Sequence, residues 1–468
     1  CILSMAGVSL SIAQPDLVFF CRYFRQLGET ERHFSLTSSE FQLLSPNTRT
    51  MPIFRSGADA NLTLAIYRRV PVLEDERSKS NPWGIRFLRM IDMANDSGMF
   101  RSESGDGLLP LYEAKMIWHF DHRFASLIGR ENSAGRLSRK YEGWYSVDYA
   151  DPNDLPTPRY WVPEESVQAR LEGWNHHWLL GFRDVTNVVV ERTAIFSLLP
   201  RTGIGHKIPL VFLERATRVH EIACWLANAN TLALDYVTRQ KVGGTSLSYF
   251  ILKQLPFLSP SAYCPTDGTF IAPRVLELVY TAWDMAPFAV DLWADADEAL
   301  RAKLEEQHQA WLHATGGHPW DPPDWAGGDA CPAPFAPAKW NEDRRALLRA
   351  ELDAYYARLY GLTRDELRYI LDPKDVYGPD FPGETFRVLK EKEERTLGEY
   401  RTRRLVLEAW DQLEEELGPV VVRNYREEMA AVPGRVAETG PTYQATVRPA
   451  TPQPLRFGAV QAPAPAAK

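Results

Sequence analysis

Short apolar runs separated by turn residues predict strands over the first half of the chain. The run from Trp178 to Pro200 is long enough for two strands, and the polar residues Thr186 and Asn187 predict the turn between them. The predicted strands are 1–10, 17–24, one within 80–101, two within 178–200 and one over 209–212.

Helical spacing dominates the second half. Near the start, Thr37 and Glu40 have capping-box spacing for a short helix that Pro46 ends. The last segments combine an apolar stripe with opposite charges four residues apart, which is typical of surface helices. Pro and Ala then dominate a tail, 431–468, that we predict to be disordered. The predicted helices are the one after Thr37, 58–69, 217–234, 294–314, 341–361 and 386–417.

Length and composition set the next limits. A chain of 468 residues predicts two or three domains, and no apolar run is long enough to span a bilayer. The five cysteines are far apart and form no CxxC pair, which argues against a disulfide scaffold or thiolate zinc site and favours a reducing cytoplasm. The opening apolar run lacks the Met and the basic start of a signal peptide. We expect a buried strand continuing from a longer protein.

Charge is uneven along this acidic chain. The net charge is −8, yet residues 183–253 contain nine Lys or Arg against five Asp or Glu, a balance of +4. The overlapping segment 235–260 places Arg239, Lys241 and the adjacent Gly243 and Gly244 beside a hydroxyl cluster. Glycine lets a backbone approach a polyanion closely, and hydroxyl and basic groups bond phosphate oxygens. A local nucleic-acid contact is therefore predicted despite the net charge.

Aromatic and basic residues also alternate over 139–178. Arg139 and Lys140 precede several Tyr and Trp residues. Such interleaving suits base stacking and phosphate contact, while the alternative is that at least half of the rings pack in a core. We expect Arg139 and Lys140 to be exposed and available for binding.

Motifs for catalysis are weak. Methylation of an amino group needs an Asn/Asp-Pro-Pro-aromatic loop, which Ser80–Trp83 and Asp321–Trp325 imitate only in part. The glycines at 203–205 lack the strand that a cofactor loop requires. His119, Asp121 and His122 lie close together without a further metal ligand at obvious spacing. The chain carries no visible methyl-transfer machinery, and a metal-dependent hydrolase is the distant alternative.

Several phrases together resemble the C-terminal portion of the large adenine-N6 DNA methyltransferases of restriction–modification and phage-defence systems. The similarity covers about 1–413, and its phrases are NTRTMPIFRS, AIYRRVPVL, NPWGIRF, LPLYEAKMIWHFDHRFA, GFRDVTNVVVERTAIFSLLP, QKVGGTSLSYFILKQLP and LYGLTRDELRYILDPKDVYGPDFPGETFRVLKEKE. In that family the S-adenosylmethionine domain lies upstream, so the resemblance implies that this chain binds no cofactor and is inactive alone.

The resemblance implies an α+β fold with three parts. Residues 1–110 would end the methyltransferase sheet and connect it, 111–265 would be a mixed target-recognition domain, and 266–430 a helical module. The implied partners are double-stranded DNA and other defence-system proteins, with no membrane. A stand-alone specificity subunit is the alternative. The residues expected at DNA are Arg139, Lys140, Arg183, Arg192, Arg201, Lys207, Arg239, Lys241, Gly243, Gly244 and Thr245.

Overall fold

The structure is a computed structural model that describes residues 15–128, 143–145, 147–323 and 334–430. The chain divides into two compact units, Cys1–Met429 and Ala430–Lys468, and only Ala430 of the second unit is described. The first unit mixes helices with small sheets, which confirms the α+β class. Across the described ranges, no helix combines the length and apolar character needed to cross a membrane.

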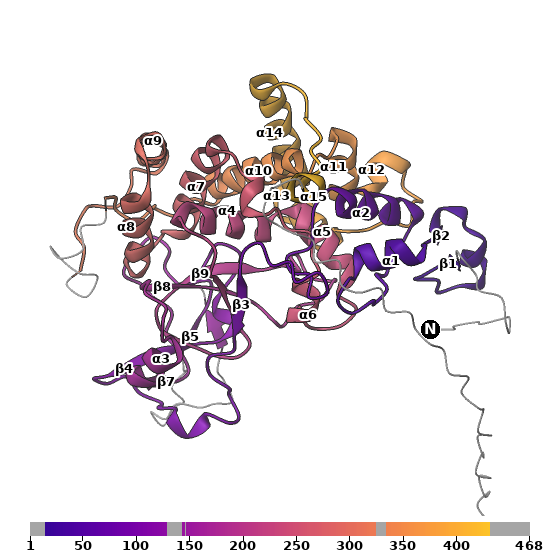
Figure 1. Cartoon of the computed structure of the whole chain (residues 1–468). Helices are drawn as coiled ribbons and strands as arrows, with labels where there is room; N and C mark the ends of the chain where they lie inside the picture. Colours follow the sequence, from indigo (N-terminus) through magenta and orange to yellow (C-terminus); the bar gives the residue numbers. More distant parts are fainter. Residues whose placement is uncertain (1–14, 129–142, 146, 324–333, 431–468) are drawn as a thin grey trace, which may run out of the picture. The chain divides into compact units, whose positions relative to one another are not determined.

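The elements of the described residues follow in chain order (Figure 1). The strands are β1 (Asp16–Leu17), β2 (Phe34–Ser35), β3 (Ile85–Leu88), β4 (Leu108–Tyr112), β5 (Ser126–Ile128), β6 (Gly143–Tyr145), β7 (Trp161–Pro163), β8 (Trp178–Phe182), β9 (Phe196–Pro200), β10 (Gly203–Ile204) and β11 (Leu210–Leu213). The helices are α1 (Ser38–Leu44), α2 (Gly57–Arg69), α3 (Glu164–Arg170), α4 (Val219–Asn230), α5 (Leu232–Lys241), α6 (Tyr249–Leu252), α7 (Pro265–Val279), α8 (Ala286–Asp295), α9 (Glu298–Thr315), α10 (Glu342–Leu359), α11 (Arg364–Leu371), α12 (Pro373–Tyr377), α13 (Arg387–Leu397), α14 (Arg401–Leu417) and α15 (Tyr425–Ala430).

A four-stranded sheet, ordered β3-β11-β8-β9, forms the centre of the strand region. β8 pairs antiparallel with β9, and β11 pairs antiparallel with both β3 and β8. Side chains alternate along β8, so Leu180 and Phe182 pack in the main core while Leu179 packs in a second apolar cluster. Both faces of the sheet are therefore buried, which explains the uninterrupted apolar run of β8.

Helices cover one face of this sheet and a smaller sheet covers the other. Trp225 of α4 meets Phe196 of β9 edge to face at 5.4 Å, and Phe288 of α8 meets Trp178 at 5.2 Å. The opposite cluster includes residues of the sheet ordered β10-β4-β7, in which β10 runs parallel to β4. In Figure 1, α4, α7 and α10 lie together on the helical side.

Segments from the expected recognition domain and helical module share this core. The Tyr356 hydroxyl of α10 donates to the Cys224 carbonyl oxygen of α4 at 2.6 Å, and α4 also packs on α7. The Asn228 amide donates to the Tyr360 hydroxyl at 2.8 Å. These contacts join residues on both sides of the predicted boundary at 265. The domain boundaries at 110 and 265 stay a prediction.

Three predicted elements were wrong in their extent. The single helix over 386–417 is two helices, because Gly398 adopts φ 78° and ends α13. The helix over 217–234 is also two, since Thr231 has an extended backbone and its side chain caps α5. The strand over 17–24 is limited to Leu17, where β1 pairs with β2. The tail and the strand at 1–10 lie outside the described residues.

Candidate nucleic-acid interface

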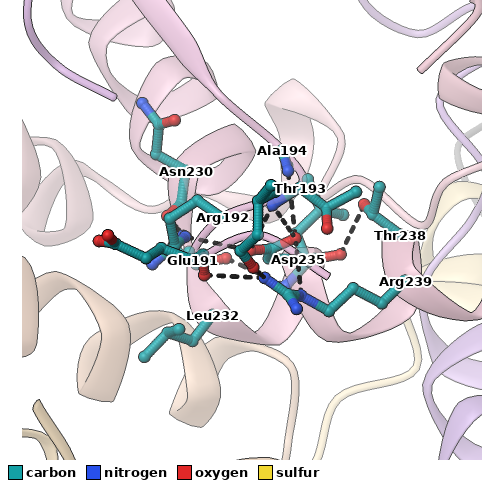
Figure 2. A network of polar contacts seen from close by, with 12 residues as sticks. Glu191, Arg192, Thr193, Ala194, Asn230, Leu232, Asp235, Thr238 and Arg239 are labelled. Atoms are coloured by element: carbon teal, nitrogen blue, oxygen red, sulfur yellow. Dashed lines mark hydrogen bonds and ion pairs between the residues drawn. The ribbon is translucent and has the colours of Figure 1, made fainter. Parts of the chain in front are cut away.

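Arg192 and Arg239 share one buried carboxylate, that of Asp235 (Figure 2). Arg192 Nε lies 3.1 Å from Asp235 Oδ2, and Arg239 Nε lies 3.5 Å from Oδ1. The same carboxylate accepts hydrogen bonds of 3.1 Å from the backbone N–H groups of Thr193 and Ala194. This network attaches the loop between β8 and β9 to α5.

Arg239 is further committed to the protein interior. Its guanidinium donates to the backbone carbonyl oxygens of Val188, Val190, Glu191 and Thr385 at 2.8–3.1 Å. The side chain is 5% exposed. Arg192, at 7%, also donates to the Asn230 carbonyl oxygen. Both arginines, expected at DNA, thus have a structural role in this fold.

Arg201 and Lys241 are also bonded within the protein. Arg201 donates to the carbonyl oxygens of Trp174 and His176 at 2.7 and 3.1 Å. Lys241 lies 3.0 Å from the Ser45 hydroxyl oxygen, and its ammonium also contacts the Leu44 carbonyl oxygen at the end of α1. Burial lowers the pKa of Lys241 to about 7.

Lys207 and the turn 243–245 lie beside the buried Asp184. Lys207 Nζ lies 3.2 Å from Asp184 Oδ2, and Arg89 Nη2 lies 3.7 Å from the same oxygen. The carboxylate belongs to a side chain that is only 4% exposed, whereas Lys207 and Arg89 are 45% and 48% exposed. Asp184 therefore holds two cations at the surface while remaining inaccessible itself.

The glycine turn lies against the same segment. Thr186 N–H donates to the Thr245 carbonyl oxygen at 3.1 Å, and Leu247 N–H donates to the Asp184 carbonyl oxygen at 2.9 Å. Leu247 is fully buried and anchors the turn, while Gly243, Gly244 and Thr245 are exposed. Within the described part of the chain, the amide N–H groups of the two glycines have no acceptor.

Neither glycine is required by its backbone angles. Gly243 and Gly244 are absent from the residues with positive φ, and a Cβ at Gly244 would meet no atom within 4 Å. A Cβ at Gly243 would lie 3.4 Å from the Ile53 side chain, an ordinary contact. The lack of side chains leaves the backbone amides open to a ligand.

An aromatic pair completes this region. Tyr249 stacks on Phe87 with ring centroids 4.9 Å apart, and the Arg89 guanidinium lies 4.9 Å from the Tyr249 centroid. Phe250, on the next position of α6, is 65% exposed.

We call Arg89, Asp184, Lys207, 243–245, Tyr249 and Phe250 the Asp184 surface. The sequence had pointed to the glycine turn and Lys207, but it gave no signal for Arg89, which directly follows β3.

The Arg183 side chain lies against Trp118 and is not part of the Asp184 surface. Its guanidinium lies 5.5 Å from the centroid of the Trp118 ring, and burial lowers its pKa. Its Nε atom is buried and has no hydrogen-bond partner among the described residues. Arg139 and Lys140 lie outside the described residues.

Comparison of the chain with protein-family models, curated proteins and solved structures gave no match.

The three candidate metal ligands do not converge. His122 Nε2 lies 2.8 Å from Asp284 Oδ1, and Asp121 accepts a 2.6 Å hydrogen bond from Tyr149. His119 lines a cleft that Asp121 also lines and His122 does not. Over the described ranges, no group of three or more His, Cys, Asp or Glu residues has the geometry to hold a metal ion.

The segment Asn81–Trp83, which partly matches a methylation loop, forms hydrogen bonds within the protein. Asn81 accepts a 2.7 Å hydrogen bond from Ile85 N–H and donates to the Ile85 carbonyl oxygen. Trp83 is 1% exposed and donates to the Leu258 carbonyl oxygen at 2.9 Å. These contacts form a turn that begins β3, which accounts for the phrase structurally.

Proposed function

We propose that this chain recognises duplex DNA as the specificity part of an adenine-N6 DNA methyltransferase. The observation that carries the proposal is the Asp184 surface, where Lys207 and the turn 243–245 lie on either side of one loop. These segments are separate in the sequence and were expected at DNA from the resemblance. Their meeting at one exposed site supports a common ligand.

The chemistry of the surface suits a phosphate backbone. Lys207 and Arg89 offer cations at the surface, and the exposed glycine turn offers amide donors. Phosphate contacts of this kind fix the register of a protein on DNA, and base contacts from neighbouring side chains add specificity. Phe250 is an exposed aromatic ring beside them. We assign it contact with sugar or base edges.

In this proposal, methyl transfer belongs to a catalytic domain outside this chain. That domain would bind S-adenosylmethionine and hold the flipped adenine. The present chain would position the site, so it would transfer no methyl group when assayed alone.

The experiment is selection of bound duplexes from a randomised library at several salt concentrations. We expect one enriched motif and an affinity that falls with salt, by a log–log slope of about 0.9 for each phosphate contact. Absence of binding even at low salt would contradict the proposal. Binding without an enriched motif would leave a general DNA contact and would contradict the specificity role.

A further inference from the structure

The loop between α1 and α2, residues 45–56, carries an unpaired cation next to the Asp184 surface. Arg49 lies near the middle of this loop and is exposed. Within the described residues, no hydrogen bond or ion pair involves its guanidinium group. The DNA contacts proposed for the Asp184 surface do not include this side chain.

The Gln254 side chain, which is 2% exposed, holds the loop in place. Its oxygen accepts hydrogen bonds of 3.2 Å from the backbone N–H groups of Asn47 and Thr48. Its amide nitrogen donates to the Thr48 hydroxyl oxygen at 3.0 Å. The Asn47 side chain donates to the Glu74 carbonyl oxygen at 2.9 Å. The two residues that precede Arg49 are therefore fixed by the surrounding protein.

Further contacts connect the loop to the Asp184 surface. The Gln254 amide also donates to the carbonyl oxygen of Phe250, which belongs to that surface, at 2.6 Å. On the other side of Arg49, the Ile53 N–H donates to the Gln240 carbonyl oxygen at 2.8 Å. The Ile53 side chain also lies next to Gly243 of the glycine turn. Both flanks of Arg49 thus contact the segment that carries the glycine turn and Phe250.

Arg49 itself has a strained backbone. Its φ of 53° is in the left-handed region, which glycine adopts freely and residues with a Cβ adopt at a cost. Its N–H donates to the Ser45 carbonyl oxygen at 2.9 Å, which closes the turn in this conformation. Strained residues are concentrated at binding sites, where the surrounding structure enforces them. Internal packing does not explain an arginine here, because the side chain is exposed and unpaired within the described residues.

The carboxylates beside the loop pair with a different cation. Lys253 Nζ lies 3.1 Å from Glu74 Oε2 and 2.7 Å from Glu76 Oε1. The Glu76 N–H donates to the Asn47 side-chain oxygen at 2.9 Å, so this ion-pair group borders the loop. The Arg49 guanidinium therefore remains available to an anionic ligand.

We propose that Arg49 binds a backbone phosphate of the duplex that occupies the Asp184 surface. This inference rests on the proposed function and adds to it a contact from a separate segment of the chain. A guanidinium group forms charge-assisted hydrogen bonds with phosphate oxygens. Because hydrogen bonds already order the loop, binding costs little further backbone entropy.

Titration of the whole chain with a labelled duplex at several salt concentrations tests this contact. The duplex is the one selected from the randomised library. Arg49→Gln should weaken binding about tenfold, because a charge-assisted hydrogen bond is lost, and should reduce the log–log salt slope by about 0.9. Arg49→Lys keeps the charge, so its affinity should stay within about threefold of the parent and its slope should not change.

The control is Arg395→Gln on α13. Arg395 is also exposed, and its side chain has no hydrogen-bond or ion-pair partner over the described ranges. Binding by this variant should equal that of the parent. Urea unfolding of Arg49→Gln should show no loss of stability, so that its weaker binding is not caused by unfolding.

The results separate this inference from the proposed function. Failure of the parent chain to bind any duplex contradicts both. Duplex binding that Lys207→Gln weakens and Arg49→Gln does not weaken supports the proposed function and overturns the Arg49 contact. An equal loss in Arg49→Lys and Arg49→Gln overturns the phosphate contact, as does an equal loss in Arg395→Gln.

Discussion

Arg192 Nε and Asp235 Oδ2 lie 3.1 Å apart inside the fold, and this contact connects the β8–β9 loop with α5. The Asp235 side chain has no exposed surface, and it also faces Arg239. One carboxylate therefore compensates two buried guanidinium groups. The loop that contains Asp184 is attached to α5 by this internal pair.

Removing the shared carboxylate should destabilise the protein strongly. Asp235→Ala leaves Arg192 and Arg239 without their counter-charge and leaves two backbone N–H groups unpaired. We expect a loss of about 3–5 kcal/mol in the free energy of unfolding, measured by urea titration. Asp411→Ala is the control, since Asp411 is 52% exposed in its pair with Arg364 and should cost no more than about 1 kcal/mol. Equal losses would contradict the structural role.

Cations of the Asp184 surface should govern DNA affinity. Lys207→Gln and Arg89→Gln should each weaken binding to the selected duplex and reduce the salt slope by about 1. The control is Arg364→Gln on α11, which is 41% exposed and outside this surface. Titrations with a labelled duplex at several salt concentrations measure both quantities. Unchanged slopes in the two surface variants would remove phosphate contact from this site.

The glycine turn offers a separate test of the same surface. Gly244→Asp should leave the unfolding free energy nearly unchanged, because the position is exposed and has open space around its Cα. The added carboxylate should repel phosphate and weaken duplex binding. Gly244→Ala is the neutral partner, and we expect it to bind nearly as well as the parent. A large loss of stability in either variant would show that the turn needs glycine.

Lys241 should make stability depend on pH. Its folded pKa, about 7, is below the usual 10.5, so between these values the unfolded chain binds more protons than the folded one. The free energy of unfolding therefore rises as the pH increases from 7 toward 10. Below pH 7 the destabilisation caused by burying the Lys241 ammonium is fully present. Between pH 7 and 9 we expect the parent to gain about 2 kcal/mol relative to Lys241→Met, measured by urea unfolding at each pH. A constant difference would contradict the shifted pKa.

Adding a side chain at Gly398 should lower the free energy of unfolding. It has φ 78° at the end of α13, a conformation that L-residues adopt with strain. Gly398→Ala should lower the unfolding free energy by about 1 kcal/mol. Gly244→Ala, at a position without positive φ, is the matched control. Equal effects of the two substitutions would remove the conformational explanation.

Local signals predicted the elements whose cause is local. The capping box of Thr37 and Glu40 is present at α1, and the helix over 58–69 is α2 with one added residue. The prediction of two strands within 178–200 is also confirmed. Helix α7 was missed, because Pro273 lies inside it and its stability comes from packing on α4 and α9.

The sequence by itself determined the mixture of strands and helices and the presence of a basic region, since apolar spacing and charge are properties of the chain. Only the tertiary structure decided which cations remain at the surface. Arg192 and Arg239 are enclosed by Asp235 and backbone carbonyls, whereas Lys207 stays half-exposed beside Asp184. Burial and pairing depend on neighbours distant in the sequence, so the spacing of charges alone does not distinguish a core arginine from a surface lysine.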